Sequence, residues 1–124
     1  MIKHSFIVAL SILVFFQAFS QNEDTLKIQL LEDEYWWGGL SSKGHNTPYN
    51  KNTVVTHNLW GNNKGNQAQP LLLSGKGRYV WSNGPIKYEF NKGELTVTTQ
   101  KGKIVSGTAG NNLRAAFNYA VKNF

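Results

Sequence analysis

The sequence predicts an all-β fold, an antiparallel β-sandwich followed by one C-terminal helix. Short segments of alternating apolar and polar residues recur along the chain, and glycine, asparagine or proline separates them. Closely spaced short strands with such turns are typical of sandwiches and barrels. The last residues differ, because their apolar side chains recur with the helical period. Cysteine is absent, so no disulfide supports the modest core of a chain this size.

The first 20 residues are expected to be a signal peptide. Lys3 and His4 give a polar start, residues 6–16 are almost all apolar, and Ala18 and Ser20 are the small residues that a signal peptidase recognises. The apolar run is about 11 residues long, whereas a membrane-spanning helix needs about 20. We therefore expect export to the periplasm or the cell exterior, a mature domain over residues 21–124, and no membrane contact after cleavage. A retained membrane anchor is the competing interpretation.

Seven segments of the mature chain are predicted as strands of an antiparallel meander, in which neighbours along the sequence pair. Alternation is clearest in 86–91, where Ile86, Tyr88 and Phe90 share one face. Loops are expected over 41–52 and over the glycine- and amide-rich segment 61–70. The predicted strands are 25–31, 53–59, 71–74, 79–81, 86–91, 94–100 and 103–106.

A helix is predicted over 112–124. Asn111 and Asn112 offer side chains that can cap its first turn, and Lys122 near its end suits the helix dipole. Apolar residues recur at helical spacing and form one face of this segment. That face comprises Leu113, Ala116, Phe117, Ala120, Val121 and Phe124.

Charge is distributed unevenly along the chain, which has a formal net charge of +6. Five of the seven acidic residues precede Tyr35, and from there on eleven lysines and arginines face only Glu89 and Glu94. The basic residues are scattered singly, without the arginine cluster or recognition helix of a nucleic-acid-binding protein. We therefore expect no nucleic-acid partner and favour a basic surface that meets an acidic one. A binder of anionic polymers is an alternative.

No catalytic residue, metal site or cofactor is expected. Glu89 and Glu94 fall on a polar strand face and beside a turn, which does not indicate a hydrolytic pair of carboxylates. The acidic run 32–34 is expected to be a solvated strand end. His45 and His57 have no cysteine or carboxylate beside them, and a zinc site needs three or four converging ligands.

The aromatic residues suggest binding instead. Trp36 and Trp37 are adjacent, so in a strand they point to opposite faces, and one of them faces a partner or ligand. Sugars stack their C–H faces on aromatic rings and bond their hydroxyls to guanidinium and amide groups. Trp36, Trp37, Arg78 and Trp81 are therefore the candidate substrate-binding residues. The competing interpretation is core packing for at least two tryptophans and a surface salt bridge for Arg78.

Four motifs resemble the N-terminal region of secreted glycoside hydrolase family 31 enzymes, the α-glucosidase and α-xylosidase-like members of the Bacteroidetes type. They are 34–39 (EYWWGG), 61–74 (GNNKGNQAQPLLLS), 76–82 (KGRYVWS) and 107–117 (GTAGNNLRAAF). The resemblance covers almost all of the mature chain. Two places depart from it: Thr47-Pro48-Tyr49, where relatives tend to read Met-Pro-Phe, and Asn83-Gly84, where they tend to carry acids before the proline.

The resemblance implies an incomplete galactose-mutarotase-like β-sandwich that packs on a catalytic (β/α)8 barrel and lends a loop to its rim. In that family two aspartates of the barrel hydrolyse α-glycosidic bonds, and no position of this chain corresponds to either. The chain would be a non-catalytic portion of such an enzyme, with the absent barrel as partner and an α-linked oligosaccharide as the ligand that the barrel binds. The first alternative is a stand-alone secreted carbohydrate-binding module.

Overall fold

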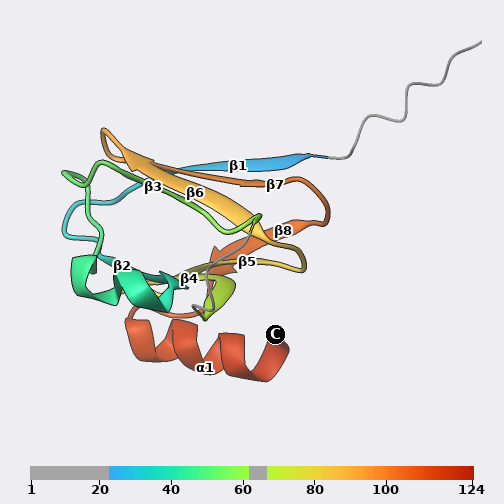
Figure 1. The fold of residues 1–124 in the computed structure, drawn as a ribbon. Helices are drawn as coiled ribbons and strands as arrows, with labels where there is room; N and C mark the ends of the chain where they lie inside the picture. The colour runs from blue at the N-terminus through green and yellow to red at the C-terminus, as the bar shows by residue number, and fades with distance from the viewer. Residues whose placement is uncertain (1–22, 62–66) are drawn as a thin grey trace, which may run out of the picture.

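The fold is a sandwich of two antiparallel sheets with one helix packed on its outside (Figure 1). The computed structural model describes residues 23–61 and 67–124. The predicted signal peptide and positions 62–66 of the amide-rich segment lie outside the described residues. Two four-stranded sheets and the C-terminal helix confirm the predicted all-β sandwich with one helix.

Each sheet combines strands from distant parts of the sequence. Sheet A contains, in spatial order, β1 (Asp24–Gln29), β7 (Glu94–Thr99), β6 (Ile86–Asn91) and β3 (Val55–Asn58). Sheet B contains β2 (Trp36–Leu40), β4 (Ala68–Ser74), β5 (Arg78–Ser82) and β8 (Ile104–Thr108). Only the β4–β5 and β6–β7 pairs are neighbours along the sequence. The predicted meander is therefore wrong, since all the remaining connections cross from one sheet to the other.

The core lies between the two sheets and follows from the alternation of the strands. Tyr88 and Phe90 of β6 pair with Val97 and Leu95 of β7, and all four side chains are buried. Because successive strand residues point to opposite faces, the intervening residues of these strands lie on the outer face of sheet A. The inner face of sheet B contributes the remaining large members of this core, chiefly Trp36, Leu72 and Val80.

Two segments predicted as loop contain residues that form regular secondary structure. β4 begins at Ala68, because Leu40 pairs with Ala68 and the Ser41 amide donates to the Gln67 carbonyl at 2.9 Å. The segment that follows β2 forms a 3₁₀-helix, η1 (Ser41–Asn46). The sequence alone could not predict the Leu40–Ala68 pairing or the hydrogen bond from Ser41 to Gln67, since each joins residues more than 25 positions apart.

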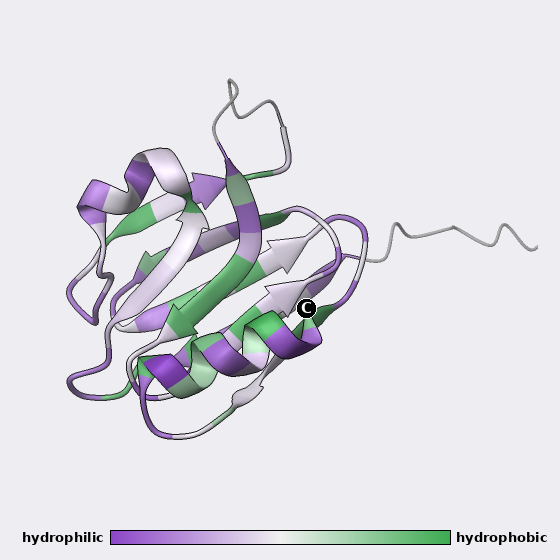
Figure 2. Ribbon diagram, turned by 90° about the horizontal axis from the view of Figure 1, so that it is seen from below, coloured by the Kyte–Doolittle hydropathy of each residue, from purple (hydrophilic) through white to green (hydrophobic). Residues whose placement is uncertain are grey.

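The C-terminal helix, α1 (Leu113–Asn123), begins as predicted: the Asn112 side chain accepts a hydrogen bond from the Ala115 amide at 2.9 Å. Ala116 and Ala120 are buried against Leu73 and Tyr79 on the outer face of sheet B. In Figure 2, α1 lies in front of sheet B and crosses only part of it. No helix within 23–61 and 67–124 is long and apolar enough to cross a membrane.

Candidate functional site

The four candidate binding residues divide between the two faces of sheet B. Trp36 and Arg78 lie on the inner side, whereas Trp37 and Trp81 lie on the outer side, where α1 packs. Trp36 is fully buried, bridges to Tyr49 through two backbone hydrogen bonds, and has the Arg78 guanidinium 5.6 Å from its ring centre. Its place in the core leaves no surface for a ligand, which corrects the expectation that Trp36 contacts a sugar.

Arg78 is held in a network centred on the buried carboxylate of Glu34. The Arg78 Nε donates to Glu34 Oε2 at 2.8 Å, and a terminal guanidinium nitrogen donates to Oε1. Ser74 Oγ and the Leu31 amide donate to the same carboxylate at 2.9 and 3.1 Å. The terminal nitrogen also donates to the Gln29 carbonyl at the end of β1, so the network joins sheet A to sheet B.

This network corrects the expectation that residues 32–34 form a solvated strand end, because Glu34 is buried. Burial by itself raises the pKa of Glu34, but hydrogen bonds from Arg78, Leu31 and Ser74 outweigh it and leave that pKa below its ordinary range. Glu34 is therefore ionised at neutral pH and fully bonded. A bidentate pair of this kind fixes geometry and leaves neither group free to transfer a proton or to bind a sugar.

Trp37 lines a hollow of about 270 Å³ beside η1, which we call the Trp37 hollow. Trp37 is half-buried, and its ring lies against Gly75. Leu40 adds an apolar side chain to the lining, and the polar side chains of the hollow are those of Ser41, Thr47, Gln67 and Gln69. An indole ring among amides and hydroxyls can stack on a sugar and bond its hydroxyl groups.

Two glycines after Trp37 allow this close arrangement. Gly38 and Gly39 both have positive φ, at 129° and 84°. A Cβ at Gly38 would lie 2.2 Å from the Leu71 carbonyl oxygen, and one at Gly39 would lie 2.3 Å from the Tyr88 hydroxyl. The strand therefore needs glycine at both positions to pass between β4 and the core and to place Trp37 at the surface.

Trp81 belongs to a second, adjoining hollow of about 440 Å³ between α1 and β4. One face of its ring stacks on Phe124, with ring centres 4.6 Å apart and planes 3° from parallel. Gln69 lines both this hollow and the Trp37 hollow, so the two lie side by side on sheet B. The structure therefore brings Trp37 and Trp81 to one surface, but in separate hollows.

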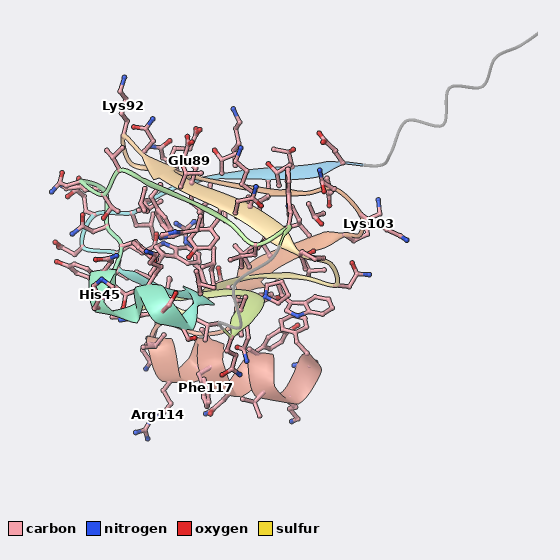
Figure 3. The ribbon with its side chains drawn as sticks, in the orientation of Figure 1. His45, Glu89, Lys92, Lys103, Arg114 and Phe117 are labelled. Carbon is pink, nitrogen blue, oxygen red and sulfur yellow. The ribbon has the colours of Figure 1, made fainter. Side chains whose placement is uncertain are left out.

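The two acidic residues that follow Tyr35 in the sequence, Glu89 and Glu94, lie on the far side of the molecule. Glu89 and Glu94 border a shallow depression on the outer face of sheet A, and Figure 3 shows Glu89 on the opposite side from α1. Glu89 accepts a hydrogen bond from Thr56 at 3.1 Å, and Glu94 accepts one from Thr96 at 3.4 Å. No group of three or more potential metal ligands occurs in the part of the chain that the structure describes. Neither glutamate is enclosed enough for acid–base work on a glycoside.

Comparison with models of known protein families and with curated proteins gives no match for this chain.

Proposed function

We propose that this chain is the non-catalytic N-terminal β-sandwich of a family 31-like glycoside hydrolase. It packs on a catalytic (β/α)8 barrel and shapes the entrance through which an α-linked oligosaccharide reaches the active site. The N-terminal 20 residues would direct it to the periplasm or the cell exterior. Hydrolysis of the α-glycosidic bond belongs to the barrel.

The resemblance to that family is supported by how its motifs meet in space. Glu34 comes from the first motif, Ser74 from the second and Arg78 from the third, and the three side chains bond to one another in the buried network. Residues up to 44 positions apart in sequence thus form one structural unit. Motifs that meet in one buried network act together in the fold, which is what supports their use as a combined signature.

The Trp37 hollow is the observation that carries the functional part of the proposal. Trp37 stands on a strand whose glycines hold it in place, so the indole face is preorganised for stacking. Gln67 and Gln69 present amide groups beside it, and Ser41 and Thr47 present hydroxyls. These residues can bind and orient a sugar ring but cannot protonate a leaving group or attack a carbon. The hollow is therefore suited to positioning a substrate for groups that another domain supplies.

The proposal is tested by producing residues 21–124 together with the catalytic domain of a family 31 α-glucosidase that lacks its own N-terminal sandwich. We expect the two to purify as a 1:1 complex that hydrolyses maltotriose. Trp37→Ala should raise the KM for maltotriose about tenfold and change kcat less, because it removes binding contacts and no reacting group. Trp60→Ala is the matched control, since Trp60 is also half-buried but lies outside the hollow. Failure to form the complex would overturn the proposal.

A stand-alone carbohydrate-binding module is the second candidate, and the open position of the Trp37 hollow favours it. Such a module would bind maltotriose without a partner, with saturable quenching of tryptophan fluorescence that Trp37→Ala abolishes. The proposed function predicts no saturable quenching by the chain alone, because half of the binding site would be contributed by the barrel.

A further inference from the structure

Exposed apolar side chains gather on α1 and on the neighbouring strand of sheet B. Eight large apolar residues are exposed in the described part of the chain, and five of them lie on this surface. Val121 and Phe117 are the most open of the five, at 69% and 55% exposed. Patches of this kind on a folded domain mark interaction sites. The five are Val105, Phe117, Tyr119, Val121 and Phe124.

The packing of α1 explains why this surface contains a groove. Leu113, Ala116, Tyr119 and Ala120 of the helix contact sheet B, and the two alanines are too small to fill the space beside them. The resulting groove is the 440 Å³ hollow that Trp81 lines, and we call it the α1 groove. Phe117 and Val121 form one of its walls. Pro70, Leu71 and Trp81 form the other wall, and Phe124 lines it beside Trp81. A groove lined by apolar side chains beside a helix is a kind of site that receives an amphipathic helix.

The charged side chains of α1 are both positive. Arg114 and Lys122 lie near the two ends of α1, and the helix has no acidic residue. The ion pairs between side chains found within 23–61 and 67–124 are Lys51–Glu32 and Arg78–Glu34, so neither helix cation takes part in one. Figure 3 shows Arg114 and Phe117 together on the outer side of α1, far from Glu89. Eight residues of helix separate the two positions by about 12 Å along the helix axis and by about 80° around it.

We propose that the α1 groove binds an amphipathic helix that carries an apolar stripe and acidic residues beside it. The stripe would fill the groove against Phe117, Val121 and Trp81. Carboxylates about two helical turns apart would pair with Arg114 and Lys122. The identity of the protein that carries this helix rests on the proposed function, under which it is the catalytic portion of the enzyme. The binding of such a helix does not rest on it.

The test uses a synthetic helical peptide of about 18 residues, long enough for several turns. It has leucine at positions i, i+3, i+4 and i+7 and glutamate on the flanking positions, and a second peptide has lysine in place of every glutamate. We expect the glutamate peptide to bind saturably, one per chain, and more weakly as salt is raised. The lysine peptide should bind at least about tenfold more weakly, because its charges match those of α1.

Two exposed valines provide the matched variants. Val121→Gln removes an apolar wall of the groove and should weaken the glutamate peptide about tenfold. Val54→Gln is the same change at a residue that is 75% exposed but lies before β3, away from α1, and should leave binding unchanged. Arg114→Gln with Lys122→Gln should reduce the salt dependence, whereas Lys27→Gln on the outer face of sheet A should not. Circular dichroism confirms that each variant is folded.

Several results would overturn this inference. They are no binding of the glutamate peptide, equal binding of both peptides, equal effects of the two valine variants, or a homodimer that Val121→Gln dissociates. The last would show that the surface joins two copies of this chain. Peptide binding without a complex with the catalytic domain would remove the proposed function and keep the groove. A complex with the catalytic domain whose affinity Val121→Gln does not change would keep the proposed function and remove the role of the groove in it.

Discussion

The outer faces of the two sheets have the same architecture and opposite chemistry. On sheet A, one row across the strands reads Thr56, Glu89, Thr96 and Lys27, all polar. On sheet B, the corresponding row reads Trp37, Leu73, Tyr79 and Gly107. An antiparallel sheet can leave a polar face to solvent, whereas an apolar face has to be covered. Sheet B therefore needs α1, and sheet A has no need of a helix.

The helix covers the outer face of sheet B only in part and leaves apolar side chains exposed. Ala116 and Ala120 bring α1 close to the sheet, but larger apolar side chains of the same helix remain exposed. A helix that served only to cover its own sheet would turn its largest apolar residues inward. Here Phe117 and Val121 remain exposed, and this is the surface on which we propose that a partner helix binds.

The largest predicted effect comes from separating the two sheets at the Glu34–Arg78 network. Arg78→Met should lower the free energy of unfolding by about 3–5 kcal/mol, because Glu34 would remain buried without its counter-charge. Urea denaturation followed by tryptophan fluorescence measures this loss. Arg78→Lys keeps a charge but loses the bidentate geometry and should fall between wild type and Arg78→Met. A loss below about 1 kcal/mol for Arg78→Met would show that the network does not hold the sheets together.

A second prediction compares the two apolar layers with one substitution. Leu95→Ala opens a cavity between the sheets, where Leu95 is fully buried, and should cost about 3 kcal/mol. Leu73→Ala opens one between sheet B and α1, where the helix can move to close it, and should cost about 2 kcal/mol. Urea denaturation of both variants gives the comparison. A larger cost for Leu73→Ala would mean that α1 packs as rigidly as the second sheet.

The sequence predicted the layers better than their connections. Alternation identified β6 and the inner face of β7, because their burial depends only on the period of each strand. It could not predict that β1 pairs with β7 or that β2 pairs with β4, since such pairing depends on contacts between distant residues. Local pattern favours hairpins between neighbours, which explains why a meander was expected.

The candidate site shows the same limit more sharply. The rule that adjacent strand residues face opposite sides separated Trp36 from Trp37, and the structure confirms that only Trp37 is accessible. The same rule could not say which of the two would be buried. Nothing local indicated that Glu34 was the partner of Arg78, because 44 positions separate them. Buried ion pairs of this kind become visible only when the fold brings their strands together.

A moderate loss of folding stability is predicted below neutral pH, and it comes from His57 on the inner face of β3. Burial, and then the charge of Lys43, lower the pKa of His57. Its Nε2 is buried without a hydrogen-bond partner among the described residues, and Tyr49 and Tyr88 pack beside the ring. The unfolded chain, with a histidine pKa of about 6.5, takes up a proton before the folded one. Stability should therefore be full above that value and fall as the pH drops from about 7 toward the folded pKa.

The control for this prediction is His57→Asn, which cannot titrate. Urea denaturation at a series of pH values between about 7.5 and 5.5 should give a falling free energy of unfolding for wild type and a flatter one for the variant. Glu34 does not interfere in this window, because its lowered pKa places its own contribution at more acidic pH, where stability is lost as the carboxylate is protonated. Parallel curves for both proteins would contradict the role given to His57.

The smallest change in folding stability is expected for a substitution on the outer face of sheet A. Glu89→Gln alters an exposed carboxylate whose partner is the Thr56 hydroxyl. Water and the new amide both replace that bond, so the free energy of unfolding should change by no more than about 0.5 kcal/mol. Glu34→Gln is the identical change within the buried network. It leaves the Arg78 guanidinium beside the core without its counter-charge, so the loss in free energy of unfolding should be several times larger. Because the two substitutions are chemically the same, a similar cost at both sites would mean that the outer face of sheet A also carries structure, and the contrast between a solvent face and a binding face would no longer hold.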